Sequence, residues 1–300
     1  MKIIAQILLL SNLLMSENAF PGLENWYHPH RMALTGAGGT FNNITAYVIN
    51  PAALWDLPRK FEVSFVSYPA DITAQSVHLS LTGKQSVTVY GLRHLNYGLF
   101  TGKDELNQNT NNYSATDTWL NWAAAGHSSQ WPISWGLSAG LFISSIDEKQ
   151  AALFTFAAGT ILDLKKLNSK FGISLINAGS VIKKYSDIEE KMPVTAVVSF
   201  AKKLAYLPLN ISVDVYSRLN TGTPAVRVGG VFTLPYRLQL KLGTTTNRLQ
   251  QLTNQSLTRD FFADTGLGMV YEYENYHFEI GVYSYGPGGW ISGLAVGIKF

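Results

Sequence analysis

Histidine is the residue type in this sequence with the most obvious capacity for chemistry. His28 and His30 lie two residues apart in "YHPH" and offer two nitrogen ligands of the kind that zinc prefers. The other four histidines are widely separated along the chain: His78, His94, His127 and His277. Two ligands in an N-terminal segment make an incomplete site, so we predict neither a metal nor any other cofactor.

The sequence contains no complete catalytic or nucleotide-binding motif. Ser128 follows His127, which raises the question of a serine nucleophile. That chemistry needs a nucleophile, a base and an orienting group placed together, and the sequence marks no carboxylate for the third role. The run "TGAGGT", residues 35–40, is not followed by Lys-Ser/Thr and is therefore not a phosphate loop. We predict a protein that is not an enzyme.

The composition is unusual for a soluble enzyme. Charged residues make up 14% of the 300 residues, against about 25% in typical soluble domains. Aromatic residues make up 12%, and there are 26 glycines. The net charge of +3 is too weak to indicate a nucleic-acid partner, and no basic stripe is present. The absence of cysteine excludes disulfides and cysteine-bound metals.

The N-terminus has the features of an export signal. Lys2 is followed by the apolar stretch "IIAQILLLSNLLM", and Ala19 is a plausible last residue before cleavage. The stretch is short for a membrane-spanning helix, which needs about 20 apolar residues. We predict a signal peptide over residues 1–19; a hydrophobic first helix of the mature fold is the alternative.

Two-residue alternation fills the rest of the chain. In residues 276–283, "YHFEIGVY", apolar Phe278 and Ile280 alternate with polar His277 and Glu279. Side chains alternate across a strand, so such segments have one apolar and one polar or small face. The pattern predicts about fourteen strands, over residues 60–68, 75–82, 85–95, 116–125, 132–144, 151–163, 169–178, 192–203, 207–217, 224–234, 236–246, 261–273, 275–284 and 290–300.

The connections alternate between longer and shorter. The longer ones fall within residues 96–117, 178–191 and 246–259, and the shorter ones include "TGKQ", "TLPY" and "YEN". Outer-membrane barrels place long loops outside and short turns in the periplasm, whereas a soluble β-sandwich has no reason to alternate them. We therefore predict an all-β protein, a single closed antiparallel barrel of about 14 strands over residues 59–300 in the bacterial outer membrane. Residues 96–116 would lie outside the cell and residues 82–85 in the periplasm.

Aromatic residues near the predicted strand ends suggest girdles at the membrane interfaces. For each of these residues taken singly, ordinary core packing is the alternative. They are Tyr68, Trp135, Tyr271, Tyr273, Tyr276 and Trp290.

The stretch "RMALTGAGGTFNNITAYVINPAALWDLPRKFEVSFVSYPADI" resembles the start of the PorV/PorQ family of outer-membrane proteins. The pattern is a glycine-rich run, a spacer, then Asn-Pro-Ala and an aliphatic residue, here Gly36, Gly38, Gly39, Asn50, Pro51, Ala52 and Leu54. Later stretches within residues 95–117, 144–162 and 171–185 are also similar, so the resemblance covers about residues 30–300. The compact size looks more like the PorQ branch.

This resemblance implies further features of the fold. The family is related to the FadL-type long-chain fatty-acid channels, which have fourteen strands and carry an Asn-Pro-Ala segment in a plug inside the barrel. By analogy, residues 20–58 form a plug in the lumen; a loose periplasmic tail is the alternative. The terminal aromatic Phe300 looks like the signal read by barrel-assembly machinery.

Two functions follow from the resemblance. The first is an accessory component of protein secretion, as in type IX secretion, acting through loops and the periplasmic face. The second is a passive FadL-like channel for hydrophobic small molecules, which needs an apolar pocket behind the plug and a gap in the wall. Strand glycines either mark kinks for such a gap or fit a narrow lumen: Gly136, Gly140, Gly159, Gly229 and Gly230. We favour the first function. The expected partners are outer-membrane lipid, the barrel-assembly machinery, and secretion components or cargo.

Overall fold

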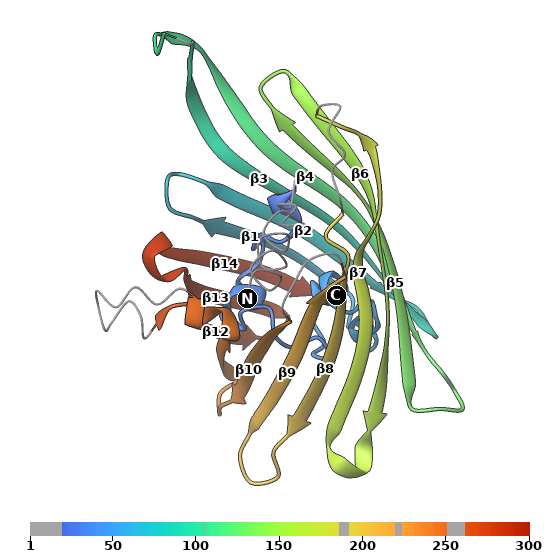
Figure 1. Ribbon diagram of the computed structural model, residues 1–300. Coiled ribbons are helices and arrows are strands. Elements are labelled where there is room, and N and C mark those ends of the chain that lie inside the picture. Colours follow the sequence, from blue (N-terminus) through green and yellow to red (C-terminus); the bar gives the residue numbers. More distant parts are fainter. Residues whose placement is uncertain (1–19, 105, 186–191, 220–223, 251–261) are drawn as a thin grey trace, which may run out of the picture.

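A closed barrel forms the body of the protein (Figure 1). The computed structural model describes residues 20–104, 106–185, 192–219, 224–250 and 262–300; the predicted signal peptide, residues 1–19, lies outside them. Fourteen antiparallel strands pair in sequence order, and β1 (Lys60–Ser67) closes the barrel by pairing with β14 (Trp290–Lys299). The predicted fold class is confirmed.

The strands differ widely in length. The other twelve are β2 (Thr73–Thr82), β3 (Ser86–Lys103), β4 (Asn109–His127), β5 (Ile133–Ile146), β6 (Lys149–Leu164), β7 (Ser169–Lys183), β8 (Thr195–Lys203), β9 (Leu209–Arg218), β10 (Ala225–Thr233), β11 (Leu238–Thr245), β12 (Thr265–Tyr273) and β13 (Tyr276–Ser284). Short 3-10 helices lie in three connections: η4 (Lys165–Leu167), η5 (Thr246–Gln250) and η6 (Gly286–Gly288).

The outer face of the barrel is apolar and the inner face is polar or small. In β1, Val63 and Phe65 are 39% and 46% exposed, while Glu62 and Ser64, which alternate with them, are 0% and 7% exposed. This arrangement suits a wall that meets acyl chains outside and a packed lumen inside. The chain is therefore a protein of the bacterial outer membrane. Within the described residues, no helix is long and apolar enough to cross a membrane.

Most of the aromatic residues predicted for the girdles are exposed near strand ends, as Trp135 and Trp290 are. Tyr68 is an exception and corrects that prediction. Its hydroxyl donates to the carbonyl oxygen of Trp26 at 2.6 Å and accepts from the Trp26 N–H at 2.7 Å. A tyrosine at a strand end can point to either side, and the polar backbone inside the barrel holds this one inward.

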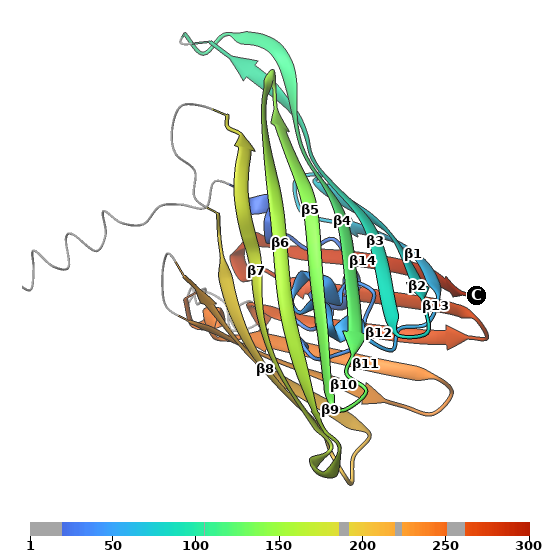
Figure 2. The ribbon, with the colours of Figure 1, turned by 90° about the vertical axis from the view of Figure 1, so that its right-hand side faces the viewer.

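The β3–β4 hairpin is longer than predicted. The predicted strands ended at residue 95 and began at residue 116, but the two strands pair as far as Lys103 and Asn109, with irregularities after Asn96 and Thr101. Figures 1 and 2 show this hairpin rising as a crest above the neighbouring strands. A strand with solvent on both faces needs no apolar side, so its sequence lacks the alternation that marks the membrane-spanning part.

Residues 20–58 fill the lumen, and we call them the lumen segment (Figure 2). It contains η1 (Pro21–Leu23), α2 (Pro29–Ala33), η2 (Ala46–Val48) and η3 (Pro51–Leu54). The apolar side chains of the segment pack against inward residues of the wall. Tyr47 and Leu54 share one cluster with Val89 of β3, and Met32 shares another with Val66 and Ile291.

Candidate functional site

Asn50 anchors the lumen segment to β6 and β7. Its backbone is extended, as the proline that follows it favours, and its side-chain oxygen accepts from the Ala52 N–H at 3.0 Å to cap η3. Its amide nitrogen donates to the carbonyl oxygens of Thr160 at 3.2 Å and Ile173 at 3.5 Å. One side chain thus starts a helical turn and ties it to two strands of the wall.

Glycines in three adjacent strands make this approach possible. A Cβ atom on Gly136 would lie 2.2 Å from the carbonyl carbon of Pro51. On Gly159 it would lie 2.2 Å from Asn50 Oδ1, and on Gly172 it would lie 3.0 Å from Asn50 Nδ2. We call this contact of Asn50 and η3 with β5–β7 the amide seam. Here Gly136 leaves room for the backbone of the segment, and Gly159 leaves room for the Asn50 side chain.

The glycine-rich run binds a carboxylate of the wall. Gly36 and Gly38 have φ values of 75° and 91°, which side chains rarely adopt. The N–H groups of Gly38 and Gly39 donate to the Asp214 carboxylate at 2.7 and 3.0 Å. The Tyr216 hydroxyl donates to the Gly36 carbonyl oxygen at 2.6 Å. The run therefore folds into a turn that two neighbouring side chains of β9 hold.

Helix α2 lies against β11–β14. Cβ atoms on Gly243, Gly266 and Gly281 would lie 2.0–2.6 Å from backbone atoms of Leu34, Met32 and Pro29, respectively. The wall here is thus in backbone contact with the segment, as it is at the amide seam.

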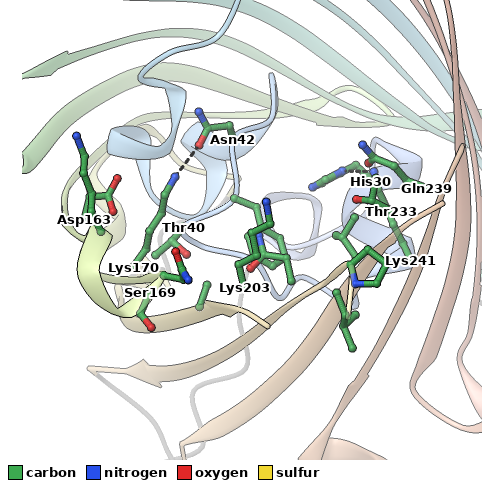
Figure 3. Close-up of a pocket in the computed structure, with 18 residues that line it drawn as sticks. His30, Thr40, Asn42, Asp163, Ser169, Lys170, Lys203, Thr233, Gln239 and Lys241 are labelled. Carbon is green, nitrogen blue, oxygen red and sulfur yellow. Dashed lines mark hydrogen bonds between the residues drawn. The ribbon is translucent and has the colours of Figure 1, made fainter. Parts of the chain in front are cut away.

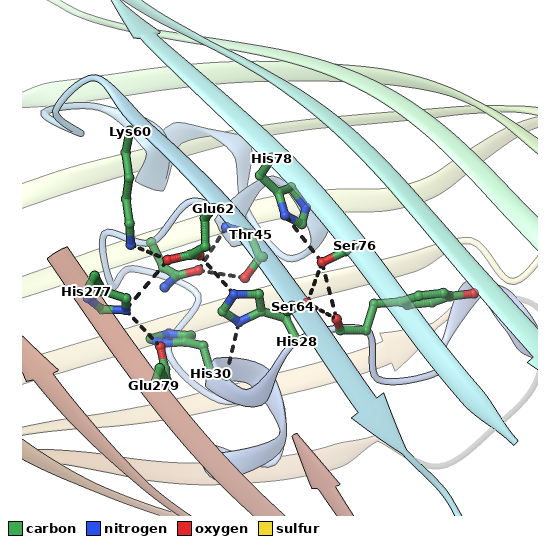
Figure 4. Close-up of polar contacts among 12 residues, drawn as sticks. His28, His30, Thr45, Lys60, Glu62, Ser64, Ser76, His78, His277 and Glu279 are labelled. Atoms are coloured by element: carbon green, nitrogen blue, oxygen red, sulfur yellow. Dashed lines mark hydrogen bonds and ion pairs between the residues drawn. The ribbon is translucent and has the colours of Figure 1, made fainter. Parts of the chain in front are cut away.

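A buried ionic network surrounds α2, and we call this contact the charged seam (Figure 4). His28 Nε2 lies 2.9 Å from Glu62 Oε1, and Lys60 also pairs with Glu62. On the other side, Lys241 Nζ lies 2.6 Å from His30 Nδ1 and pairs with Glu279. His277 lies between the two carboxylates, 3.6 Å from Glu62 and 3.4 Å from Glu279.

The network tunes the protonation of His30. Burial lowers the pKa of His30 to about 4, with a further contribution from the charge of Lys241, so the ring is neutral near pH 7 and accepts from the lysine. The histidines predicted as an incomplete metal pair thus contact different carboxylates. In the part of the chain that the structure describes, no group of three or more His, Cys, Asp or Glu residues is arranged to hold a metal.

The sequence analysis did not predict this network. Its wall members come from β1, β11 and β13, and only the fold brings them together: Lys60, Glu62, Lys241, His277 and Glu279. The sequence feature that could have indicated the network is a charged residue at an inward-facing position of a strand, as with Lys241 and Glu279. The other residues singled out for catalysis lie elsewhere, with His127 stacked on Trp55 and hydrogen-bonded to Ser134.

Two cavities flank this part of the barrel. One, of about 660 Å³, opens at the short-turn end beside the lumen segment and is lined by Lys165, Lys170, Lys203 and Lys241 with Asp163 (Figure 3). The other, of about 750 Å³, is an apolar hollow on the outer face of β9–β13. The strand ladder between this hollow and α2 is unbroken from β10 to β13, so no gap connects the hollow with the lumen.

Phe300 lies at the end of the wall. Its side chain is 64% exposed, and its N–H donates to the Arg59 carbonyl oxygen at 3.2 Å. Its role as an assembly signal stays a prediction.

Comparison with solved structures identifies the architecture. The CymD monoaromatic hydrocarbon channel aligns with a TM-score of 0.66 at 10% identity, covering 95% of this chain and 99% of the channel. The P. putida toluene transporter TodX aligns with a TM-score of 0.61 at 10% identity, covering 93% of this chain and 99% of the transporter. The chain shares the fold of these channels along nearly its whole length.

Sequence comparison adds nothing further. No family model and no curated protein matches the chain. The specific resemblance to the PorV/PorQ family therefore gains no support, whereas the fold is shared with outer-membrane channels.

Proposed function

We propose that this protein is a passive, non-enzymatic channel that admits hydrophobic small molecules through the outer membrane. The observation that carries the proposal is the likeness in fold, over nearly all of both chains, to a monoaromatic hydrocarbon channel and a toluene transporter. The sequence alone favoured an accessory role in protein secretion. The comparisons support the alternative better, because the two structures that share this fold over nearly their whole length are named as a hydrocarbon channel and a toluene transporter.

The wall beside the apolar hollow is unbroken, so passage does not use a gap there. The contacts of the lumen segment instead suit a movable closure. Beyond its peptide connection to β1, the described part of the segment is joined to the wall by side-chain hydrogen bonds, ion pairs and packing, without a disulfide. Each bond of the amide seam is modest in net free energy, so the segment can shift locally while the barrel stays intact. A solute moving down its own gradient then needs no cofactor.

A reversible lock of the segment tests this proposal. The chain has no cysteine, and a Cβ on Gly229 would lie 2.9 Å from the Ala37 Cβ. A disulfide between Ala37→Cys and Gly229→Cys needs this separation to open by about 1 Å. Cells that express the double variant in their outer membrane should take up the hydrophobic dye N-phenyl-1-naphthylamine several-fold more slowly when oxidised. Reduction should restore the wild-type rate.

The two single-cysteine variants are the controls, because they carry the same substitutions without a link. Dye entry equal to that of cells lacking the protein, under both oxidising and reducing conditions, would contradict the channel. Co-purification of secretion components or secreted cargo from the native outer membrane would then support the secretory function instead. Outer-membrane lipid and the barrel-assembly machinery are partners that we propose in either case.

A further inference from the structure

Two arginines at the contact between lumen segment and wall lack an anionic partner. Arg31 lies in α2 and Arg227 in β10. Their guanidinium carbons lie 5.8 and 6.0 Å from the centre of the same Trp26 ring, and Arg227 also lies 3.9 Å from the Tyr216 ring. Within the described residues, neither arginine forms an ion pair with a carboxylate.

The unmatched donors are concentrated in this one cluster. Nε and Nη1 of Arg31, Nε of Arg227 and Nε1 of Trp26 are all buried without a hydrogen-bond partner. A buried charge without a partner is costly, and an unmatched buried donor adds to that cost. Burial lowers the pKa of Arg31 to about 10, and the charge of Arg227 acts in the same direction, although Tyr216 opposes it. The group nevertheless keeps its charge near pH 7.

Nearby carboxylates do not fill this role. Asp214 is opposite Arg227 in the β9–β10 register, but it accepts from the N–H groups of Gly38 and Gly39 and from the Ser212 hydroxyl. Asp264 accepts from the hydroxyls of Tyr283 and Thr245. The fold has therefore directed the adjacent acids to other donors.

Arg93 shows that the lumen can satisfy an arginine with its own residues. Its side chain is buried, and Nε and Nη2 donate to Asn121 Oδ1 at 3.2 and 2.8 Å. Its guanidinium carbon also lies 3.6 Å from the centre of the Trp119 ring. The unmatched donors of Arg31 and Arg227 are thus a local feature.

We propose that Arg31, Arg227 and Trp26 form a binding site for a carboxylate-sized anion that links the lumen segment to the wall. A guanidinium presents paired donors that match the two oxygens of a carboxylate, and the indole N–H supplies one more. Both arginine residues retain some exposed surface, although their unmatched donor atoms are themselves buried. The anion is either a free ion of the medium or the head group of an amphiphile. The inference does not depend on the channel function.

Carboxylate-dependent melting tests the site. The mature chain, refolded in a non-ionic detergent, is titrated with sodium formate while sodium HEPES keeps the ionic strength constant. Formate should raise the melting temperature with a half-maximal concentration in the millimolar range. Arg227→Gln and Arg31→Gln should each weaken the response at least tenfold, and Arg93→Gln, the matched lumen control, should change it less than twofold. If one of the two site variants does not refold, the other still tests the site, because Arg31 belongs to the lumen segment and Arg227 to the wall.

A second titration with sodium hexanoate separates the two sources. A half-maximal concentration equal to that of formate identifies a free ion. A value at least tenfold lower, with competition by formate, identifies an amphiphile head group. A wild-type melting temperature that does not respond to formate, or an unchanged response in the refolded site variants, would overturn the inference even if dye uptake supports the channel.

Discussion

The lumen segment contacts the barrel wall in two chemically different ways. At the amide seam, Asn50 donates to backbone carbonyls of β6 and β7 beside Gly136 and Gly159, and no charge is involved. At the charged seam, α2 lies among Glu62, Glu279, Lys241 and their histidine neighbours. Both seams use wall glycines for close approach. Their difference shows what each contact requires to be stable. The amide seam requires a close fit of shape, and the charged seam requires that every buried charge has a partner.

The largest expected effect comes from leaving one charge unpaired at the charged seam. Glu279 is 0% exposed and pairs with Lys241, so Glu279→Gln removes the charge that compensates a buried ammonium. We expect a loss of about 3–5 kcal/mol in the free energy of unfolding. Urea titration of the refolded barrel in lipid vesicles measures it. Lys299→Gln is the control, because its pair with Glu272 is about one-third exposed and should contribute at most about 1 kcal/mol. Equal losses would remove the distinction between buried and exposed pairs.

Acid should weaken the charged seam through His30. Its pKa is about 4 in the fold against 6.5 in the unfolded chain, so only the unfolded chain binds a proton between these values. The stability that neutral His30 provides is complete above pH 6.5 and falls as the pH drops toward 4, by about 3 kcal/mol in total. The pH dependence of urea unfolding should be correspondingly flatter in His30→Gln. His127→Gln, a histidine far from this seam, should retain the wild-type slope.

The amide seam should respond to added volume. Gly136→Ala places a methyl group 2.2 Å from the backbone of Pro51, which cannot rotate away. We expect a loss of about 1–3 kcal/mol and faster protease cleavage within the lumen segment. Gly230→Ala is matched to it, because the nearest atom to its new methyl group is a flexible Leu209 methyl at 3.3 Å. Similar sensitivity in both variants would show that shape does not control this seam.

Removal of the amide should have a smaller effect. Asn50→Ala loses the cap of η3 and two weak bonds to carbonyls that belong to the strand ladder, for a total of about 1–2 kcal/mol. The half-life of the lumen segment under limited proteolysis reports this change. Asn42→Ala loses two exposed bonds, to the Trp55 carbonyl oxygen and from Lys170 Nζ, and should leave the half-life nearly unchanged. A stable segment in both variants would mean that the glycine contacts alone hold the amide seam.

The smallest effect on stability lies outside both seams, at Phe300. Its side chain is mostly exposed on the outer face, so its deletion should barely change the melting temperature in detergent. If the residue is chiefly an assembly signal, the same deletion should strongly reduce the amount of barrel inserted in cells. Parallel losses in the two measurements would show that Phe300 is a packing residue.

The sequence predicted the barrel because lipid imposes a strict pattern on its wall. Where lipid is absent, in the upper part of β3 and β4, the pattern weakens and the predicted ends were wrong. The amide seam was anticipated only through a resemblance around Asn-Pro-Ala, and its wall glycines had two interpretations. The charged seam was missed because Glu62 and Glu279 are 217 positions apart and meet only across the closure of the barrel. A charged residue at an inward-facing strand position indicates that it has an ion-pair partner, but the sequence does not identify that partner.

The uneven height of the wall determines the direction from which the mouth can be approached. β4 has 19 residues and β9 has 10, so the tall side extends nine residues further, about 30 Å along the strand. In an outer leaflet covered by a dense sugar layer, the tall side would stand among the sugars while the low side ends near the lipid head groups. The entrance would then face sideways, and solutes gliding along the membrane surface would reach it more easily than solutes descending from above.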